Sequence, residues 1–201
     1  MQKKGFTLVE LLIVIGILAI LSAATVLILN PAQILQESRD TQRLNDMSTI
    51  SSALSLYLAT VSSAEKNLDA VAETAPNLGR CTVDPAVNSN PFGTHNDADS
   101  LCVLDTDRTV TNAGWIDVDL TETSGGSPMA VLPIDPTNSG NYMYAYEADD
   151  TNNTFELNTR LESARYRVNM ENDGGNSNTC TGTYVDATCW YEVGNDPGLN
   201  L

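Results

Sequence analysis

The sequence is poor in the residues that most catalytic sites require. Its 201 residues include a single histidine, His95, which lies in the polar stretch FGTHNDADS. A general base needs an oriented partner, and Asp97 and Asp99 are merely close to it along the chain. The chain also lacks a G-x-S-x-G motif and a phosphate-binding glycine loop. No catalytic set is visible, so we expect a protein that is not an enzyme.

Positive charge is also scarce. The chain has 10 basic and 26 acidic residues, a formal net charge of −16 and a pI near 4.1. A surface this negative repels phosphate backbones, so non-specific nucleic-acid binding is not expected. The acidity is typical of a soluble, solvent-exposed surface.

What the chain does have is one long apolar run near its start. From Phe6 to Leu29 few residues are clearly polar, namely Thr7, Glu10, Ser22 and Thr25. A helix needs about 20 apolar residues to cross a bilayer, whereas the apolar core of a secretory signal has only about 7–15. We therefore predict a membrane-spanning segment. Lys3 and Lys4 precede it, which places the N-terminus in the cytoplasm and the rest of the chain outside.

Glu10 is out of place in this run. A carboxylate at the centre of a span costs about 2.5–3.5 kcal/mol on insertion scales, and less near one end. Because the run contains no lysine or arginine, the counter-ion must come from elsewhere. Cleavage between Gly5 and Phe6 would create an α-amino group four residues from Glu10, on the same helix or on a neighbouring one.

The stretch KKGFTLVELLIVIGILAIL resembles the N-terminus of type IV prepilins and type II secretion pseudopilins. Those families share a basic leader that ends in glycine, then phenylalanine, then an apolar run with glutamate at its fifth position. The resemblance implies that a prepilin peptidase cuts after Gly5 and methylates the amine of Phe6. It also implies that Glu10 pairs with the Phe6 amine of an adjacent subunit. The alternative is a plain signal anchor that tolerates an acid.

The apolar run is expected to continue into a second, amphipathic half of one long helix, from Phe6 to about Ser62. Residues at three- and four-residue steps form an apolar stripe there: Met47, Ile50, Leu54, Tyr57, Leu58 and Val61. Proline kinks or breaks a helix, so we expect a bend near Pro31, with Gly16 as a second weak point. A dimeric coiled coil is the weaker alternative for the stripe, because heptads are not sustained.

The remainder predicts a small head built on an antiparallel sheet of three to five strands. Alternating or apolar runs predict the strands, and ADDTNN would join the middle pair as a hairpin. The strand segments are WIDVDL (115–120), YMYAYE (142–147), TFELNTRL (154–161), TYVD near Tyr184 and CWYEV from Cys189. Residues 64–111 read mainly as loop, with a short helix around Lys66–Glu73. LPIDPTNSGNYMYAYE and FELNTRLES extend the resemblance into the pilin-like head.

Together these patterns predict an α+β fold shaped like a lollipop, in which a long N-terminal helix packs on the small sheet through its second half. The expected organisation has four parts. They are a leader at 1–5, a transmembrane and filament-core helix at 6–29, an amphipathic half at 30–63 and a globular head at 64–201.

The chain has four cysteines and none forms a C-x-x-C pair, so zinc is disfavoured. An even number behind a membrane segment suggests disulfides outside the cytoplasm. Four cysteines allow three pairings. We favour the local one, Cys81 with Cys102 and Cys180 with Cys189. Crossed bridges and free buried thiols stay open.

Calcium is weighed because major pseudopilins often bind it in a head loop. Calcium takes six to eight oxygen ligands. The candidate donors are Asp97, Asp99, Asp105, Asp107, Asp149, Asp150 and Asp173. DTDRTV lacks the turn glycine of an EF-hand, and NMENDG would need glutamate where Cys180 stands. We therefore expect no cofactor, with calcium left as an alternative.

The sequence is compatible with three functions. The first is a structural subunit of a surface filament, a helical homo-oligomer that depends on the membrane, the prepilin peptidase, an assembly platform and minor pilins. It would be a single-pass membrane protein as a precursor and extracellular once assembled. The second is a pseudopilin, a piston subunit of a secretion machine. The third is a monomeric surface-anchored binding protein whose helix is only a tether.

Overall fold

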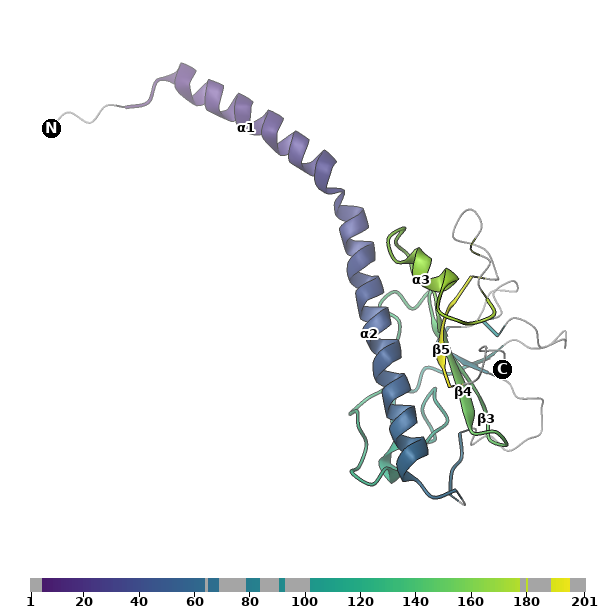
Figure 1. Cartoon of the computed structure of the whole chain (residues 1–201). Helices are drawn as coiled ribbons and strands as arrows, with labels where there is room; N and C mark the ends of the chain where they lie inside the picture. Colours follow the sequence, from purple (N-terminus) through teal and green to yellow (C-terminus); the bar gives the residue numbers. More distant parts are fainter. Residues whose placement is uncertain are drawn as a thin grey trace.

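The structure, a computed structural model, describes residues 5–63, 65–68, 79–83, 91–92, 102–177, 180 and 189–195. It consists of a long helical rod and a head that packs on the second half of that rod (Figure 1). The first half of the rod projects away from the head. This is the α+β, pilin-like arrangement expected from the sequence.

The rod consists of two helices, α1 (Leu8–Leu29) and α2 (Pro31–Thr60). A single bent helix was expected, but the chain leaves the helical conformation at Asn30, which is left-handed with φ 39° and ψ 74°. The residue before a proline is disfavoured in the α region, and asparagine tolerates the left-handed one. Helix α1 runs through Gly16 without interruption, so the break lies at Asn30–Pro31.

The predicted apolar stripe of α2 is buried against the head. Met47, Ile50, Leu54 and Tyr57 are each at most 1 % exposed. They form one core with side chains from the sheet, among them Tyr144, Tyr146, Phe155 and Leu157, and with Trp115. Burial of a full apolar side chain contributes about 1.5–3 kcal/mol, so this stripe holds the head on the rod.

The sheet has five strands in the order β2-β1-β3-β4-β5. The strands are β1 (Arg80–Cys81), β2 (Val103–Leu104), β3 (Tyr144–Asp149), β4 (Thr154–Thr159) and β5 (Tyr191–Gly194). The predicted hairpin is confirmed as β3–β4, and the strand expected in CWYEV is confirmed as β5. The sheet is mixed rather than purely antiparallel because β1 and β2 pair in parallel. Both strands have only two residues, too few to carry a strand pattern, and they lie in residues 64–111, which were expected to be mainly loop.

The strand predicted for WIDVDL is wrong. Residues 115–119 form no strand, and a 3-10 helix, η1 (Leu120–Glu122), follows them. The backbone bonds of this segment go to a neighbouring loop, from Trp115 N to Asp107 O (2.8 Å) and from Leu120 N to Val110 O (2.9 Å). The alternation also fails, because Trp115, Ile116 and Asp117 are all buried. The apolar residues of this segment are buried as expected, but the segment neither alternates in burial nor pairs as a strand.

A short helix that the sequence did not predict, α3 (Arg167–Glu171), lies beside α2 near its start (Figure 1). The two favoured disulfides are present, Cys81–Cys102 and Cys180–Cys189. The strand expected at TYVD lies outside the described residues. So does most of the helix expected at 66–73, of which the described residues 66–68 are not helical.

Candidate functional site

The first turn of α1 places Glu10 where the sequence motif requires an acid. Thr7 is the N-cap residue, and its hydroxyl oxygen accepts the Glu10 N–H at 3.3 Å. In return the Glu10 carboxylate accepts the Thr7 N–H at 2.9 Å and the Thr7 hydroxyl at 2.8 Å. This is a capping box, in which residues three apart satisfy each other's groups at the start of a helix. Thr7 therefore gives Glu10 hydrogen bonds within its own chain.

The rest of α1 presents apolar side chains to its surroundings on every side. None of the stretch Leu8–Val26 is buried, although it is long and apolar enough to cross a membrane. Phe6, the residue after the expected cleavage point, is 87 % exposed. Isolated soluble proteins do not leave an apolar surface of this size in water. Helix α1 therefore needs a lipid bilayer or other helices around it.

A buried cluster of charges fixes the head on the rod. Arg43 of α2 is fully buried and bonds Asp135 through Nε (2.5 Å) and Nη2 (2.9 Å). It also contacts Asp40 at 2.9 Å and Glu162 at 2.7 Å. Arg39 forms a second ion pair with Glu162. We call these five residues the clamp. Since Arg43 lies on α2 while Asp135 and Glu162 belong to the head, the clamp sets where the head sits along the rod.

The backbone of the head also binds the clamp. Both carboxylate oxygens of Asp40 accept N–H groups, from Glu162 at 2.8 Å and from Ser163 at 2.7 Å. Burial alone would raise the pKa of Glu162, but its bonds to Arg39 and Arg43 lower that pKa below the ordinary value. Likewise burial opposes the charge on Arg43, yet the bonds to Asp135 and Glu162 raise its pKa. Each acidic and basic side chain of the clamp therefore lies against a partner of opposite sign.

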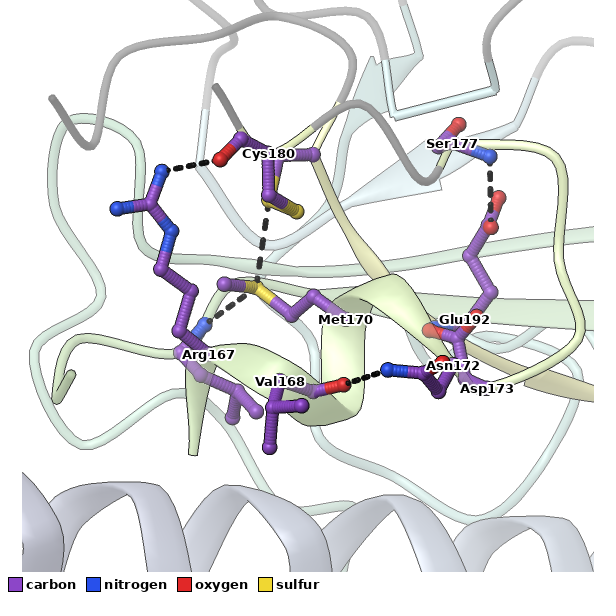
Figure 2. Close-up of a disulfide and its surroundings, with 10 residues drawn as sticks. Arg167, Val168, Met170, Asn172, Asp173, Ser177, Cys180 and Glu192 are labelled. Carbon is purple, nitrogen blue, oxygen red and sulfur yellow. Dashed lines mark hydrogen bonds between the residues drawn. A yellow bond between two sulfur atoms is a disulfide. The ribbon is translucent and has the colours of Figure 1, made fainter. Parts of the chain in front are cut away.

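A second polar cluster connects residues 173–177, which follow α3, to the strand β5. The Glu192 carboxylate accepts the Ser177 N–H at 2.9 Å (Figure 2). The Glu192 N–H donates to the Asp173 carboxylate at 2.9 Å. Burial raises the pKa of Glu192 to about 8, with a further contribution from the nearby charges of Glu156 and Asp173. A side chain at Gly175 would overlap the Glu192 side chain and force it to move. This cluster ties residues 173–177 to β5.

The C-terminal disulfide and α3 form one unit. Met170 is buried in a small core with Cys180 and Cys189, and its sulfur lies 4.0 Å from that of Cys189. Arg167 donates to the Cys180 carbonyl at 2.6 Å (Figure 2). The bridge therefore anchors a helix that itself packs near the start of α2.

The acidic residues considered for calcium are used differently, or lie outside the described residues, as do Asp97, Asp99 and His95. Asp105, Asp107 and Asp149 accept backbone N–H groups two residues ahead, which stabilises turns. Asp150 accepts the Leu68 N–H at 2.6 Å. In the part of the chain that the structure describes, no group of three or more His, Cys, Asp or Glu side chains is placed to hold a metal ion.

Sequence reasoning missed the clamp. Asp40 and Arg43 lie in the charged stretch QESRDTQRLND, and Asp135 and Glu162 come from distant parts of the chain. The one available signal was that Asp40 and Arg43 are three residues apart, and thus on one helix face, in register with the apolar stripe that begins at Met47.

Comparison with known proteins found a match at the N-terminus of the chain, which includes the first turn of α1. Residues 1–26 match the family model described as the prokaryotic N-terminal methylation motif. The chain thus carries the class III signal found in type IV pilins and pseudopilins, and a signal of this kind implies processing by a prepilin peptidase and assembly at a membrane. No curated protein and no solved structure matches the chain.

Proposed function

We propose that the protein is a structural subunit of a type IV pilus-like surface filament. One observation carries this proposal: an apolar helix with no buried surface follows directly on a prepilin processing motif. In the precursor α1 would span the membrane, with the leader in the cytoplasm and the head outside. In the filament the same surface would pack against the α1 helices of other copies, and the heads would coat the outside.

The start of α1 would determine both how the precursor is cleaved and how neighbouring copies are aligned in the filament. Cleavage after Gly5 would expose the amine of Phe6, which is then methylated. Only one oxygen of Glu10 takes part in the capping box with Thr7. The other oxygen is available for the Phe6 amine of a neighbouring copy. Such a pairing would offset the cost of a carboxylate in an apolar core and would set the stagger between copies.

The test combines one processing variant with one pairing variant. We expect Gly5→Val, which blocks cleavage, and Glu10→Ala, which removes the pairing, each to abolish sheared surface fibres. The melting temperature of the head should not change, because neither residue touches it. Glu122→Ala, at an exposed acid of η1, is the matched control and should leave fibres intact. Normal fibres from Gly5→Val or Glu10→Ala would contradict the proposal.

Two further measurements separate the alternatives. Mass spectrometry of the native protein should find N-methyl-Phe6 as the mature N-terminus, whereas an intact Met1 would favour the tethered binding protein. A pseudopilin would be indicated by lost secretion in a strain that lacks this chain, without loss of surface fibres.

A further inference from the structure

Two buried oxygen atoms on neighbouring strands have no hydrogen-bond donor among the described residues. They are Oδ1 of Asn158, on β4, and Oε1 of Glu192, on β5. Both residues lie in the interior of the head, with 0 % and 2 % of their surface exposed. A buried polar atom without a partner is unfavourable and rare in folded proteins. The two atoms therefore require an explanation.

The sheet brings these two residues together. Asn158 and Glu192 are directly opposite each other in the antiparallel pair of β4 and β5. The Glu192 N–H turns away from β4 and donates to Asp173, so the two residues form a non-hydrogen-bonded pair. In such a pair the Cα atoms are about 4.5 Å apart, and the side chains lie on one face of the sheet at their closest approach. The two side chains are thus within reach of each other.

Other bonds fix the remaining polar atoms of both side chains. Nδ2 of Asn158 donates to the Pro91 carbonyl at 2.8 Å and to the Glu156 carboxylate at 2.6 Å. A turned amide would bring its oxygen against these two acceptors, so Oδ1 stays on the other side. The second oxygen of Glu192 accepts the Ser177 N–H at 2.9 Å. Two acceptors thus remain, and one hydrogen between them would satisfy both.

We propose that the carboxyl group of Glu192 is neutral in the folded head and donates its proton from Oε1 to Oδ1 of Asn158. This bond would join β4 and β5 through their side chains, beneath residues 173–177. Burial raises the pKa of Glu192 to about 8, in agreement with a neutral group at pH 7. The inference does not depend on the proposed filament function.

The charges around Glu192 also favour its neutral form. Glu156 and Asp173 add to the effect of burial and raise its pKa. Arg160 is a cation on this face and lies over the ring of Trp190, its guanidinium carbon 4.1 Å from the ring centroid. On α3, Arg167 bonds the Cys180 carbonyl and Glu171 is exposed. The described charged residues on this face of the sheet and beside it are Glu147 of β3, Glu156 and Arg160 of β4, and Asp173 after α3.

Loss of this proton would loosen the segment that covers the edge of β5. Residues 173–177 lie along that edge, where the Trp190 N–H donates to the Ser177 carbonyl at 3.1 Å. An ionised Glu192 would place a negative charge against Oδ1 of Asn158. A hollow of about 540 Å³ between α3 and β5, which Glu192 helps to line, gives water a route to the cluster. The contact of residues 173–177 with β5 should therefore weaken as the pH rises.

Carbon NMR of the full-length chain in detergent, with glutamate isotope-labelled at its carboxyl carbon, measures the proton directly. The signal that is missing from Glu192→Gln identifies Glu192. We expect this signal to titrate near pH 8, and the signals of exposed glutamates to titrate near the ordinary value. A Glu192 signal that titrates together with the exposed glutamates would overturn the inference.

Asn158→Leu tests the acceptor. If Oδ1 accepts the proton, its loss should lower the titration midpoint of Glu192 by about one pH unit, the equivalent of one hydrogen bond. A more apolar neighbour alone would raise the midpoint, so the sign of the shift separates the two causes. An unchanged or raised midpoint would contradict the bond. So would a wild-type midpoint that falls on addition of calcium and recovers with a chelator, because a cation would then lie between the oxygen atoms.

Glu192→Gln makes the outcome independent of the Asn158 variant. Its amide can donate to Asn158 and accept from Ser177, so it reproduces the protonated form. Hydrogen exchange of the Ser177 and Trp190 amides is compared in wild type and variant at the same pH. We expect the ratio of the two rates to rise by up to about tenfold per pH unit between the ordinary glutamate pKa and pH 8, and then to level off. Glu122→Gln, at an exposed acid of η1, is the matched control and should follow wild type. A ratio that does not change with pH would overturn the inference.

Discussion

The two halves of the rod invert the usual distribution of side chains. Helix α1 exposes its apolar residues from Leu8 to Val26, while α2 buries the guanidinium of Arg43 at its contact with the head. The apolar half makes no use of tertiary structure in the single chain, because its helix is stabilised by local bonds. The charged half has one local ion pair, Asp40 with Arg43, and depends on distant residues for its contacts with Asp135 and Glu162. The contact of α2 with the head is therefore completed within one chain, whereas the apolar surface of α1 needs a bilayer or other helices to cover it.

The largest expected effect comes from breaking the clamp. Arg43→Met keeps the length of the side chain but leaves Asp40 and Asp135 buried without their cation, and leaves Glu162 with Arg39 alone. Loss of one partner from a buried charge set costs about 3–5 kcal/mol. Thermal unfolding of the full chain in detergent measures it. The control Arg165→Met, at an exposed pair with Glu37, should cost about 0–1 kcal/mol. Equal losses of stability in the two variants would show that the buried clamp stabilises the protein no more than an exposed ion pair does.

A smaller effect of the same kind follows from Glu162, which bonds both arginines of the clamp. Glu162→Gln should lower stability at pH 7 by about 1.5–3 kcal/mol, the usual range for hydrogen bonds to charged groups. The pKa of Glu162 is depressed in the folded protein. Its contribution is therefore present above the ordinary glutamate pKa and is lost as the pH falls through the folded value. The difference between variant and wild type should vanish in an acid titration of the melting temperature.

Glu192 is expected to behave in the opposite way to Glu162, because its pKa is raised, to about 8. Between the ordinary glutamate pKa and pH 8 the folded state holds a proton that the unfolded state releases, so this group makes stability fall as the pH rises. Glu192→Gln cannot ionise, and its amide oxygen can still accept the Ser177 N–H. We expect it to be more stable than wild type above pH 8, as measured by chemical denaturation at pH 6 and pH 9. A parallel pH response in both proteins would rule this out.

The smallest effect on the head is expected from α1. Ile17 is 54 % exposed in a segment that has no buried residue. Ile17→Ser should leave the free energy of unfolding of the head within about 0.5 kcal/mol of wild type, as for other exposed substitutions. Its effect should appear only in membrane retention and fibre yield. A clear loss of head stability would show that α1 folds back on the head in solution.

Sequence patterns predicted the elements whose cause is local. The apolar helix α1, the buried stripe of α2, the β3–β4 hairpin and β5 each depend on a pattern that belongs to one segment. They failed where pairing decides the outcome: residues 115–119 alternate like a strand but donate their backbone bonds to a loop. The short strands β1 and β2 and the helix α3 have too few residues to carry a pattern. The clamp was missed because Arg43 and Asp135 are 92 positions apart.

The sequence by itself determined that the chain begins with a prepilin motif and an apolar helix, and it favoured the two disulfide pairings, because these depend on composition and spacing over short distances. Only the tertiary structure decided where the head sits on the rod, which charges are buried and where a hollow opens between α3 and β5. Those features depend on side chains that folding brings together from distant parts of the chain. Local preferences do not encode such contacts.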